Sequence, residues 1–535
     1  MGSGPDRPRS GIAALALILM AGNILSRVLG LVREQLSASL FGTGDVIAAF
    51  TVADNLQTLL FDLMVSGALQ AALVPVLAQW AAPDPASRAE LRRLGGTLIV
   101  LVTLILGVLA TAGIIFAPAI VGGLTWFSGA GASRDQATVE LTTRLVRIVL
   151  PAAVFLGIGT LLQAMLFALD RVTAPALSTA VRNLAIVLAA ILLSGALGVE
   201  SLAWGTVAGA IAIVLVQLPP LVRAGAMPVL SLHLRHPALR EMAMLYIPVF
   251  LGLLVSSAAV IVDRGLAWGA EEYALGAMRY ATTLVQLVLG LVAAAIGLAA
   301  LPTLSRHFAA ADEEAFGATL GRALMLVTVL ILPATFGLAA LAGPISALLF
   351  GYGETGDVGA RWIAIALLGY LPGTLAAAYD QVLIFAFYAR RNTWLPVLVG
   401  VLAIVTYLAV ALLSVDAFGM IGLVAANSAQ FIVHAGVMWW FASRRFGWAA
   451  DPRLGQLIPR CAMAALVMAF VALGTWWGLD RLLPGASGGR EIARRGLLVA
   501  FPVAIASPMY LTLIWPLCGA EVRRLWTQRR ARHAH

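Results

Sequence analysis

Ionisable side chains inside long apolar segments are the first feature of this sequence that could do chemistry. Arg27, Arg33 and Glu34 all lie in the apolar stretch 11–41, and Ser26 directly precedes the first of them. In lipid an ionisable side chain is costly unless it is paired or faces water. Arginine keeps its charge and offers a planar fork of donors that suits phosphate. The pattern therefore indicates an anion site within a membrane.

Helical spacing sets which of these residues share a face. Asn23, Arg27, Gly30 and Glu34 recur at intervals of three or four, so they line one side of a helix. Arg33 follows Arg27 by six residues and points roughly 120° away from it. We expect both arginines to face a hydrated cavity. The alternatives are a network confined to one helix and an Arg33 that reaches the lipid headgroups.

A polar stripe in the second apolar stretch, 46–80, points to the same cavity. Its members follow helical spacing: Asp54, Asn55, Thr58, Asp62, Ser66 and Gln70. We predict that its carboxylates neutralise the arginines when no substrate is bound. The alternative is a buried polar seam between two helices.

Three further charged residues lie in the seventh and eighth apolar stretches. These are Asp263, Arg264 and Arg279, and we expect them on the opposite wall of the cavity. The alternative is that 263–272 lies near the membrane surface, where a charge costs little.

The composition defines the class of protein that must position these residues. The chain has 535 residues, of which 61% are hydrophobic and only 11% charged. A soluble domain has about 25% charged residues, and a disordered chain would need low hydrophobicity. The apolar runs are long and continuous, unlike the short alternating strands of a membrane β-barrel. The sequence predicts an all-α polytopic membrane protein.

About fourteen transmembrane helices are expected, since each needs roughly 20 apolar residues. The predicted spans are 11–41, 46–80, 94–118, 138–169, 174–198, 201–222, 243–268, 272–304, 319–349, 360–388, 394–414, 417–443, 455–479 and 494–517. The basic residues are all arginine, and they gather in the two termini and in alternate loops. By the positive-inside rule both termini are cytoplasmic. In a membrane protein the net charge of +9 therefore gives no reason to expect a nucleic-acid partner.

A weak internal repeat predicts two lobes. Val-Pro-Val-Leu at 74–77 resembles Leu-Pro-Thr-Leu at 301–304, and FALDRVT at 167–173 resembles FYARRNT at 387–393. These offsets pair each span with the sixth span after it, so the two copies share an orientation, and a substrate site lies between them. We predict an N-lobe at 1–222, a cytoplasmic connector at 223–242 that includes a short amphipathic helix, a C-lobe at 243–443, and two extra helices with a basic tail at 444–535.

The absence of lysine from the sequence excludes one source of energy for transport. The chain contains no lysine, so the phosphate-binding motif GxxxxGK[ST] cannot occur. Transport would then draw on an ion gradient, the membrane potential or the substrate concentration. The two cysteines, Cys461 and Cys518, lie in apolar runs and support neither a disulfide framework nor a metal cluster.

Several segments of the chain resemble a known family, the lipid II flippases of the MurJ/MviN group in the MOP superfamily. The most specific is SRVLGLVREQLSASLFGTG at 26–44. Similar matches are SGALQAALVPVLAQW at 66–80, VDRGLAWGAEEYALGAMRYA at 262–281, ALPTLSR at 300–306 and FYARRNTWLP at 387–396. The likeness runs over most of the chain and implies the same two-lobe plan.

The resemblance implies that the chain is a transporter rather than an enzyme, in the bacterial cytoplasmic membrane. Its substrate would be lipid II, the undecaprenyl-pyrophosphate-linked glycopeptide of peptidoglycan biosynthesis, moved to the outer leaflet by alternating access. Ser26, Arg27 and Arg33 match the family's cavity residues, and Glu34 matches their acidic neighbour. Asp263 matches an aspartate linked to sodium in some members, so Na+ or the membrane potential would couple transport without any other cofactor. We expect a monomer.

The chain also departs from the family pattern. Ala48 stands where the family usually has an acid, Phe61 where it has an arginine, and Thr283 where it has the cavity arginine of the eighth span. The polar residues of the sodium site are replaced near Tyr407 and Ala411.

Because of these departures, we also consider other functions. One is a flippase for another polyprenyl-pyrophosphate-linked oligosaccharide, and a more distant one is an exporter of the same superfamily. An exporter of organic cations should line its cavity with acids and aromatic residues, which the arginines oppose. A membrane glycosyltransferase would need carboxylates in a sizeable outer loop, whereas the first predicted outer loop has about four residues.

Overall fold

The computed structural model describes residues 9–65, 73, 74, 76–82, 84–126, 135–233, 259–445, 452–485 and 488–533, together with 236, 237, 239, 253 and 257. Two residues of the predicted polar stripe, Ser66 and Gln70, lie outside the described residues. So does most of 234–258, which holds the end of the predicted connector and the start of the predicted seventh span.

The described residues form helices and no strands. Helices suit lipid because every backbone polar group inside the bilayer must be satisfied within its own segment. Ten described helices are long and apolar enough to cross a membrane, and one of them, at Trp394–Arg445, is two helices joined at a bend. The all-α polytopic class is therefore confirmed, while the number fourteen stays a prediction.

The chain divides into two compact units, Met1–Gly276 and Ala277–His535. The first unit contains α1 (Arg9–Phe41), α2 (Asp45–Val65), α4 (Pro85–Ile115), α5 (Ala117–Trp126), α6 (Gln136–Val149), α7 (Ala152–Ala168), α8 (Thr173–Leu197) and α9 (Glu200–Arg223). A further helical stretch covers 259–269. The lobe limits expected from the sequence stay a prediction.

The second unit begins inside α11 (Ala274–Val288). It continues through a π-helical turn, η1 (Leu289–Ala293), to α12 (Ala294–Ala309), α13 (Glu313–Ala340), α14 (Ala342–Phe350), α15 (Gly356–Ala389), α16 (Trp394–Arg445), α17 (Pro452–Leu482) and α18 (Gly489–His533).

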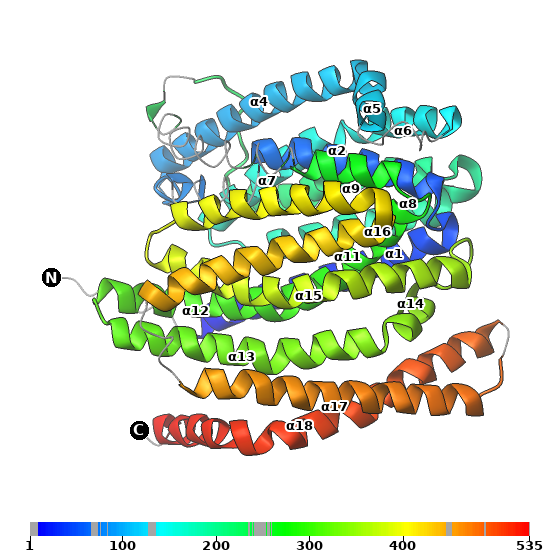
Figure 1. Cartoon of the computed structure of the whole chain (residues 1–535). Helices are drawn as coiled ribbons and strands as arrows, with labels where there is room; N and C mark the ends of the chain where they lie inside the picture. The colour runs from blue at the N-terminus through cyan, green and yellow to red at the C-terminus, as the bar shows by residue number, and fades with distance from the viewer. Residues whose placement is uncertain are drawn as a thin grey trace. The chain divides into compact units, whose positions relative to one another are not determined.

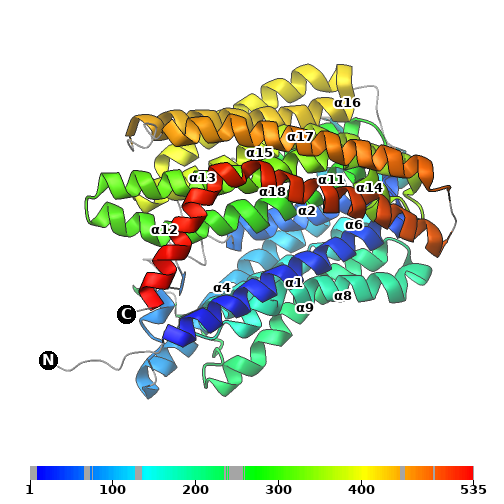
Figure 2. The ribbon, with the colours of Figure 1, turned by 90° about the horizontal axis from the view of Figure 1, so that it is seen from below.

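Within the first unit, α1 runs beside α8 (Figure 2). Small residues permit this close approach, since a Cβ added to Gly22 would lie 2.4 Å from the carbonyl oxygen of Ala176 on α8. A polar residue also links the two helices, because Gly30 faces the side-chain amide of Asn183. The position of α1 is thus set by its small and polar face rather than by a large apolar one.

Residues 226–233 of the connector have no regular secondary structure, whereas 237 and 239 are helical. The segment 226–233 pairs with the start of α4: the Val229 amide donates to the Arg92 carbonyl at 3.0 Å, and Arg92 Nε donates to the Met227 carbonyl at 2.9 Å. Gly96 makes room for it, since a Cβ there would lie 1.8 Å from the Val229 carbonyl oxygen. These hydrogen bonds hold the start of the connector against α4, and the amphipathic helix predicted within 223–242 stays a prediction.

Within the second unit, α13 lies between α15 and the last helical hairpin, α17 and α18 (Figure 1). One apolar core joins α12, α13, α15 and α16, and a second joins α13 to α17 and α18. The hairpin is therefore packed as part of the second unit.

Turns recur at a constant offset in the two units. Asp170 and Arg391 both have φ of 58°, and Gly198 and Gly419 have φ of 54° and 51°. Both pairs are 221 residues apart (391 − 170 and 419 − 198). The hydrogen bond that closes the first turn, Arg171 N to Leu166 O, has its counterpart in Asn392 N to Phe387 O. The structure thus shows local counterparts of the repeat seen in the sequence.

Candidate substrate-binding site

Helix α1 carries most of the predicted anion site. Its apolar sequence has no proline between Arg9 and Phe41, so the helix is uninterrupted. Arg27 Nε donates to Asn23 Oδ1 at 2.9 Å, one turn earlier. This contact places the two polar residues on one face, as their spacing predicts.

A second guanidinium on α1 is held by a network that reaches another helix. Arg33 Nε and Nη2 donate to Glu34 Oε1 at 3.1 and 2.5 Å, and Arg33 Nη1 donates to Asn183 Oδ1 at 3.2 Å. Glu34 is buried, whereas the Arg33 side chain stays 21% exposed. The network fixes the guanidinium while leaving part of it accessible to a ligand.

Asn183 on α8 is a site residue that our sequence reasoning missed. Its carbonyl oxygen accepts from Arg33, and its amide nitrogen donates to the Ser26 backbone carbonyl at 3.0 Å. One buried side chain thus orients Arg33 and links α8 to α1. The feature of the sequence that could have identified Asn183 is the polar pair Arg182-Asn183 within an apolar stretch.

The described part of the polar stripe lies on α2. Asp54, Asn55 and Asp62 are all half-buried, and Asp62 has no hydrogen bond or ion pair within the described chain. The Asn55 amide nitrogen is buried without a hydrogen-bond partner there, and so are both amide atoms of Gln57. Because buried polar groups are normally satisfied, these atoms indicate places for ordered water inside the helix packing. Gln57 was not among the predicted residues.

The predicted opposite wall is divided between the two units. Asp263 and Arg264 contact each other at 3.5 Å and are both partly exposed, and the Arg264 Nε atom is buried without a hydrogen-bond partner among the described residues. Arg279 lies on α11 in the second unit, half-buried. The structure thus pairs Arg33 with Glu34 and Arg27 with Asn23 on α1, and it places Asp263 beside Arg264.

No group of three or more histidine, cysteine, aspartate or glutamate residues that could hold a metal occurs in the part of the chain described here. The role of Asp263 as a sodium ligand, suggested by the resemblance, stays an expectation. Tyr407 and Ala411, where that resemblance loses its polar residues, are both buried in α16.

The three other positions that depart from the family pattern carry uncharged side chains, which cannot pair with an anion. Ala48 is fully buried on α2. Thr283 directs its hydroxyl to the Arg279 carbonyl of its own helix at 3.2 Å. Phe61 packs against the core formed by α7 and α9.

A buried acid–base pair in the second unit was not assigned to the site. Asp380 on α15 lies 2.8 Å from His434 Nδ1, and His434 Nε2 lies 3.4 Å from the Pro396 carbonyl oxygen. Asp380 falls within the predicted span 360–388 and was not among the predicted site residues. The structure buries it against a second titratable group.

Solved structures with the same arrangement of helices define the class of this protein. A structure titled "Lipid II flippase MurJ, inward closed conformation" matches with a TM-score of 0.76 and 20% identity, covering 95% of this chain and all of that one. An inward-facing MATE family multidrug transporter of the MOP superfamily matches with a TM-score of 0.65 and 14% identity, over 81% of this chain and 98% of that one. The fold is that of multi-helix MOP transporters.

The family follows from the sequence comparisons. The model described as "Lipid II flippase MurJ" matches residues 37–487. A Vibrio cholerae protein named a probable lipid II flippase MurJ is 29% identical over 95% of this chain and 96% of its own length. A Burkholderia cenocepacia protein named lipid II flippase MurJ is 27% identical over 94% and 96%. The chain belongs to the lipid II flippase MurJ family, whose members are transporters rather than enzymes.

Proposed function

We propose that this chain is a lipid II flippase of a bacterial inner membrane, moving the lipid-linked peptidoglycan precursor from the cytoplasmic to the outer leaflet. The observation that carries the proposal is the family match over residues 37–487. Relatives that span almost the whole chain carry the same activity in their names. The positive-inside pattern of loop arginines supports cytoplasmic termini.

The arginines of α1 supply the chemistry that such a substrate requires. A pyrophosphate is held by charge-assisted hydrogen bonds from guanidinium groups, which remain protonated in any environment. Arg33 is already oriented by Glu34 and Asn183, so binding orders it little further. In this proposal Arg27 and Arg33 hold the pyrophosphate, while Asp54 and Asp62 balance their charge when the site is empty. Arg264 and Arg279 supply further guanidinium groups to the substrate in this proposal.

Alternating access is the transport cycle we infer for this flippase. The headgroup would stay in a hydrated cavity and the polyprenyl chain in the bilayer, while two lobes rock around the site. Coupling to the membrane potential or to Na+ through Asp263 is part of the proposal, and so is a monomeric state.

The test is complementation in a bacterium depleted of its own lipid II flippase. We expect the wild-type chain to restore growth and cell shape, and Arg27→Ala or Arg33→Ala to fail despite normal expression. Arg322→Ala is the matched control, since that exposed side chain bonds, among the residues that the structure describes, only to Ala318 and Thr319 of its own helix. Labelling of lipid II at the outer surface of spheroplasts would measure transport directly. No rescue by a well-expressed wild-type chain would refute the proposal.

One observation supports a second candidate. The positions Ala48, Phe61 and Thr283 lack the charges that the family usually carries there, which fits a flippase of another polyprenyl-pyrophosphate-linked oligosaccharide. In that case the wild-type chain would not rescue lipid II transport, but it would restore translocation of the other glycan.

A further inference from the structure

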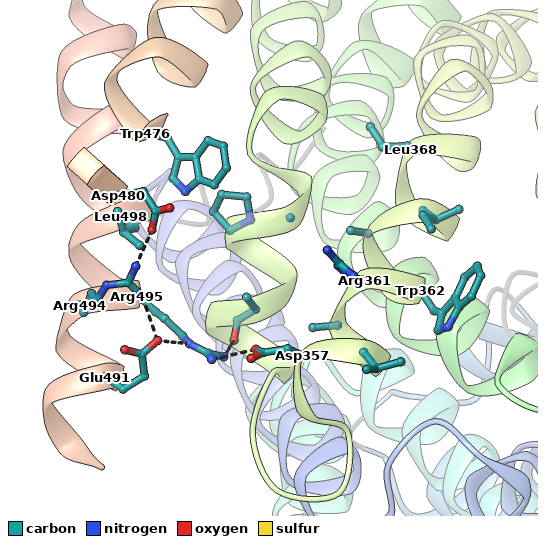
Figure 3. Close-up of a pocket in the computed structure, with 17 residues that line it drawn as sticks. Asp357, Arg361, Trp362, Leu368, Trp476, Asp480, Glu491, Arg494, Arg495 and Leu498 are labelled. Carbon is teal, nitrogen blue, oxygen red and sulfur yellow. Dashed lines mark hydrogen bonds and ion pairs between the residues drawn. The ribbon is translucent and has the colours of Figure 1, made fainter. Parts of the chain in front are cut away.

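A pocket in the second unit lies away from the proposed transport site. It has a volume of about 890 Å³ and is enclosed by α14, α15, α17 and α18 (Figure 3). It is located near the residues that join α17 to α18 and α14 to α15, so it lies at the ends of membrane-spanning helices. Three arginines and three acidic residues line it: Arg361, Arg494, Arg495, Asp357, Asp480 and Glu491.

Two of the arginines are held in place by several hydrogen bonds within the protein. Arg494 donates to Asp480 at 2.5 Å, to Glu491 at 3.2 Å and to the Leu483 carbonyl at 3.2 Å. Arg495 donates to Glu491 and Asp357, each at 2.8 Å, and to two backbone carbonyls of α14 and its end. These bonds fix the α18 side of the pocket.

Arg361 differs from the other two arginines. It comes from the α15 side of the pocket, whereas Arg494 and Arg495 come from the α18 side (Figure 3). It is exposed, and it forms no hydrogen bond or ion pair with any residue in the described ranges. It therefore leaves a guanidinium fork free to bind an anion at the edge of the pocket.

Two carboxylates on the pocket wall keep unused acceptor capacity. The side chain of Asp357 is 75% exposed and that of Asp480 is 42% exposed, and each binds a single arginine nitrogen. A carboxylate has about four lone-pair positions, so each can still accept from an ammonium group. The indole of Trp476 lies in the same wall and offers a face to a cation.

The surroundings favour a lipid over a soluble ligand. Val358 and Leu368 line the pocket and are themselves exposed, so apolar surface continues from it along α15. Next to the pocket, Trp477 is exposed beneath the Arg481 guanidinium, which lies 3.5 Å from the ring centroid. Aromatic residues with nearby arginines are typical of the headgroup level of a bilayer.

We propose that this pocket binds the zwitterionic headgroup of phosphatidylethanolamine. Arg361 holds the phosphate, Asp480 accepts a hydrogen bond from the ammonium, and the acyl chains lie against Val358 and Leu368. The bound lipid joins α15 to the last helical hairpin. This site is separate from the proposed flippase activity and does not depend on it.

The test compares three lipids on the purified full-length protein. Native mass spectrometry and thermal unfolding would be measured after adding phosphatidylethanolamine, phosphatidylcholine or phosphatidylglycerol with identical chains. Choline cannot donate hydrogen bonds and glycerol carries no positive charge. We expect phosphatidylethanolamine to be retained and to stabilise the protein most, by about fivefold to tenfold in affinity, the effect of about one hydrogen bond at an exposed site.

Three variants make the test specific. Arg361→Gln and Asp480→Asn should each lower retention of phosphatidylethanolamine about tenfold, and Arg361→Lys should restore part of it because the charge remains. Arg481→Gln, on the same surface but outside the pocket, should leave retention unchanged. Equal retention of all three lipids, or equal loss in Arg481→Gln and Arg361→Gln, would overturn the proposal.

Discussion

The Arg33–Glu34 pair gives the sharpest test of the site's energetics. We consider the single substitutions Arg33→Met and Glu34→Met and the double variant, because methionine keeps the length of each side chain without its charge. Glu34 receives two of the three hydrogen bonds that Arg33 donates to other side chains. Each single substitution therefore removes the ion pair while keeping the charge of the other residue.

The expected coupling energy follows from the burial of the pair. Breaking a fully buried ion pair costs about 3–5 kcal/mol. The Arg33 side chain is 21% exposed and keeps Asn183 as a partner, so solvent and that amide compensate part of the loss. Hydrogen bonds between helices in membrane proteins average only about 0.6 kcal/mol. We expect a coupling energy of about 1–3 kcal/mol, since hydrogen bonds to charged groups contribute about that much.

The assay is a double-mutant cycle on the free energy of unfolding, measured in mixed detergent–SDS micelles. Each single variant should be destabilised, and the double variant by less than their sum. The exposed Arg144–Glu200 pair, 3.0 Å apart in the same unit, is the control and should couple by about 0.2–1 kcal/mol. A coupling for Arg33 and Glu34 below about 0.5 kcal/mol would be additive behaviour and would refute the reasoning.

Three further predictions concern stability. His434→Leu leaves buried Asp380 without its partner, so the free energy of unfolding should fall by about 1–3 kcal/mol, and Asp380→Leu added to it should cost little more. Gly96→Ala should displace the connector at Val229 and speed its cleavage by protease, whereas Gly107→Ala, which meets open space, should not. Hydrogen bonds from the first turn of α4 lower the pKa of Asp84. The ionised Asp84 therefore stabilises the fold fully above its unfolded pKa of 3.8, and this stabilisation is lost as the pH falls through the lower folded pKa. A thermal-unfolding series in acid should show that Asp84→Asn loses less stability than the wild type.

Much of the fold could be predicted because few backbone structures can span a bilayer. Long apolar runs must become helices. The predicted stretches 94–118 and 319–349 nevertheless run past a break in the helix, at Phe116 and at Leu341. The predicted stretches 394–414 and 417–443 are consecutive parts of α16, divided at Gly419, whose φ of 51° suits glycine. The family resemblance was equally visible in the sequence, since its motifs are local.

The partners of the charged residues could not be predicted in the same way. Helical spacing placed Arg27 and Asn23 on one face, but it did not show that Arg33 is held by Glu34 and by Asn183, 150 residues away. Nor did it pair Asp380 with His434, which are 54 residues apart. Periodicity describes one helix at a time, whereas these contacts depend on which helices pack together.

The sequence by itself determined that this chain is a helical membrane transporter and which of its segments carry charge into the bilayer. The apolar runs, the arginine-rich loops and the family motifs contain that information. The tertiary structure alone decided that Asn183 orients Arg33, that residues 226–233 extend along α4, and that Arg361 lines a pocket near the last hairpin. The physical reason is that a side chain's surroundings are made by residues distant in sequence, and small contact residues such as Gly22 and Gly96 reveal their neighbours only when the helices are packed.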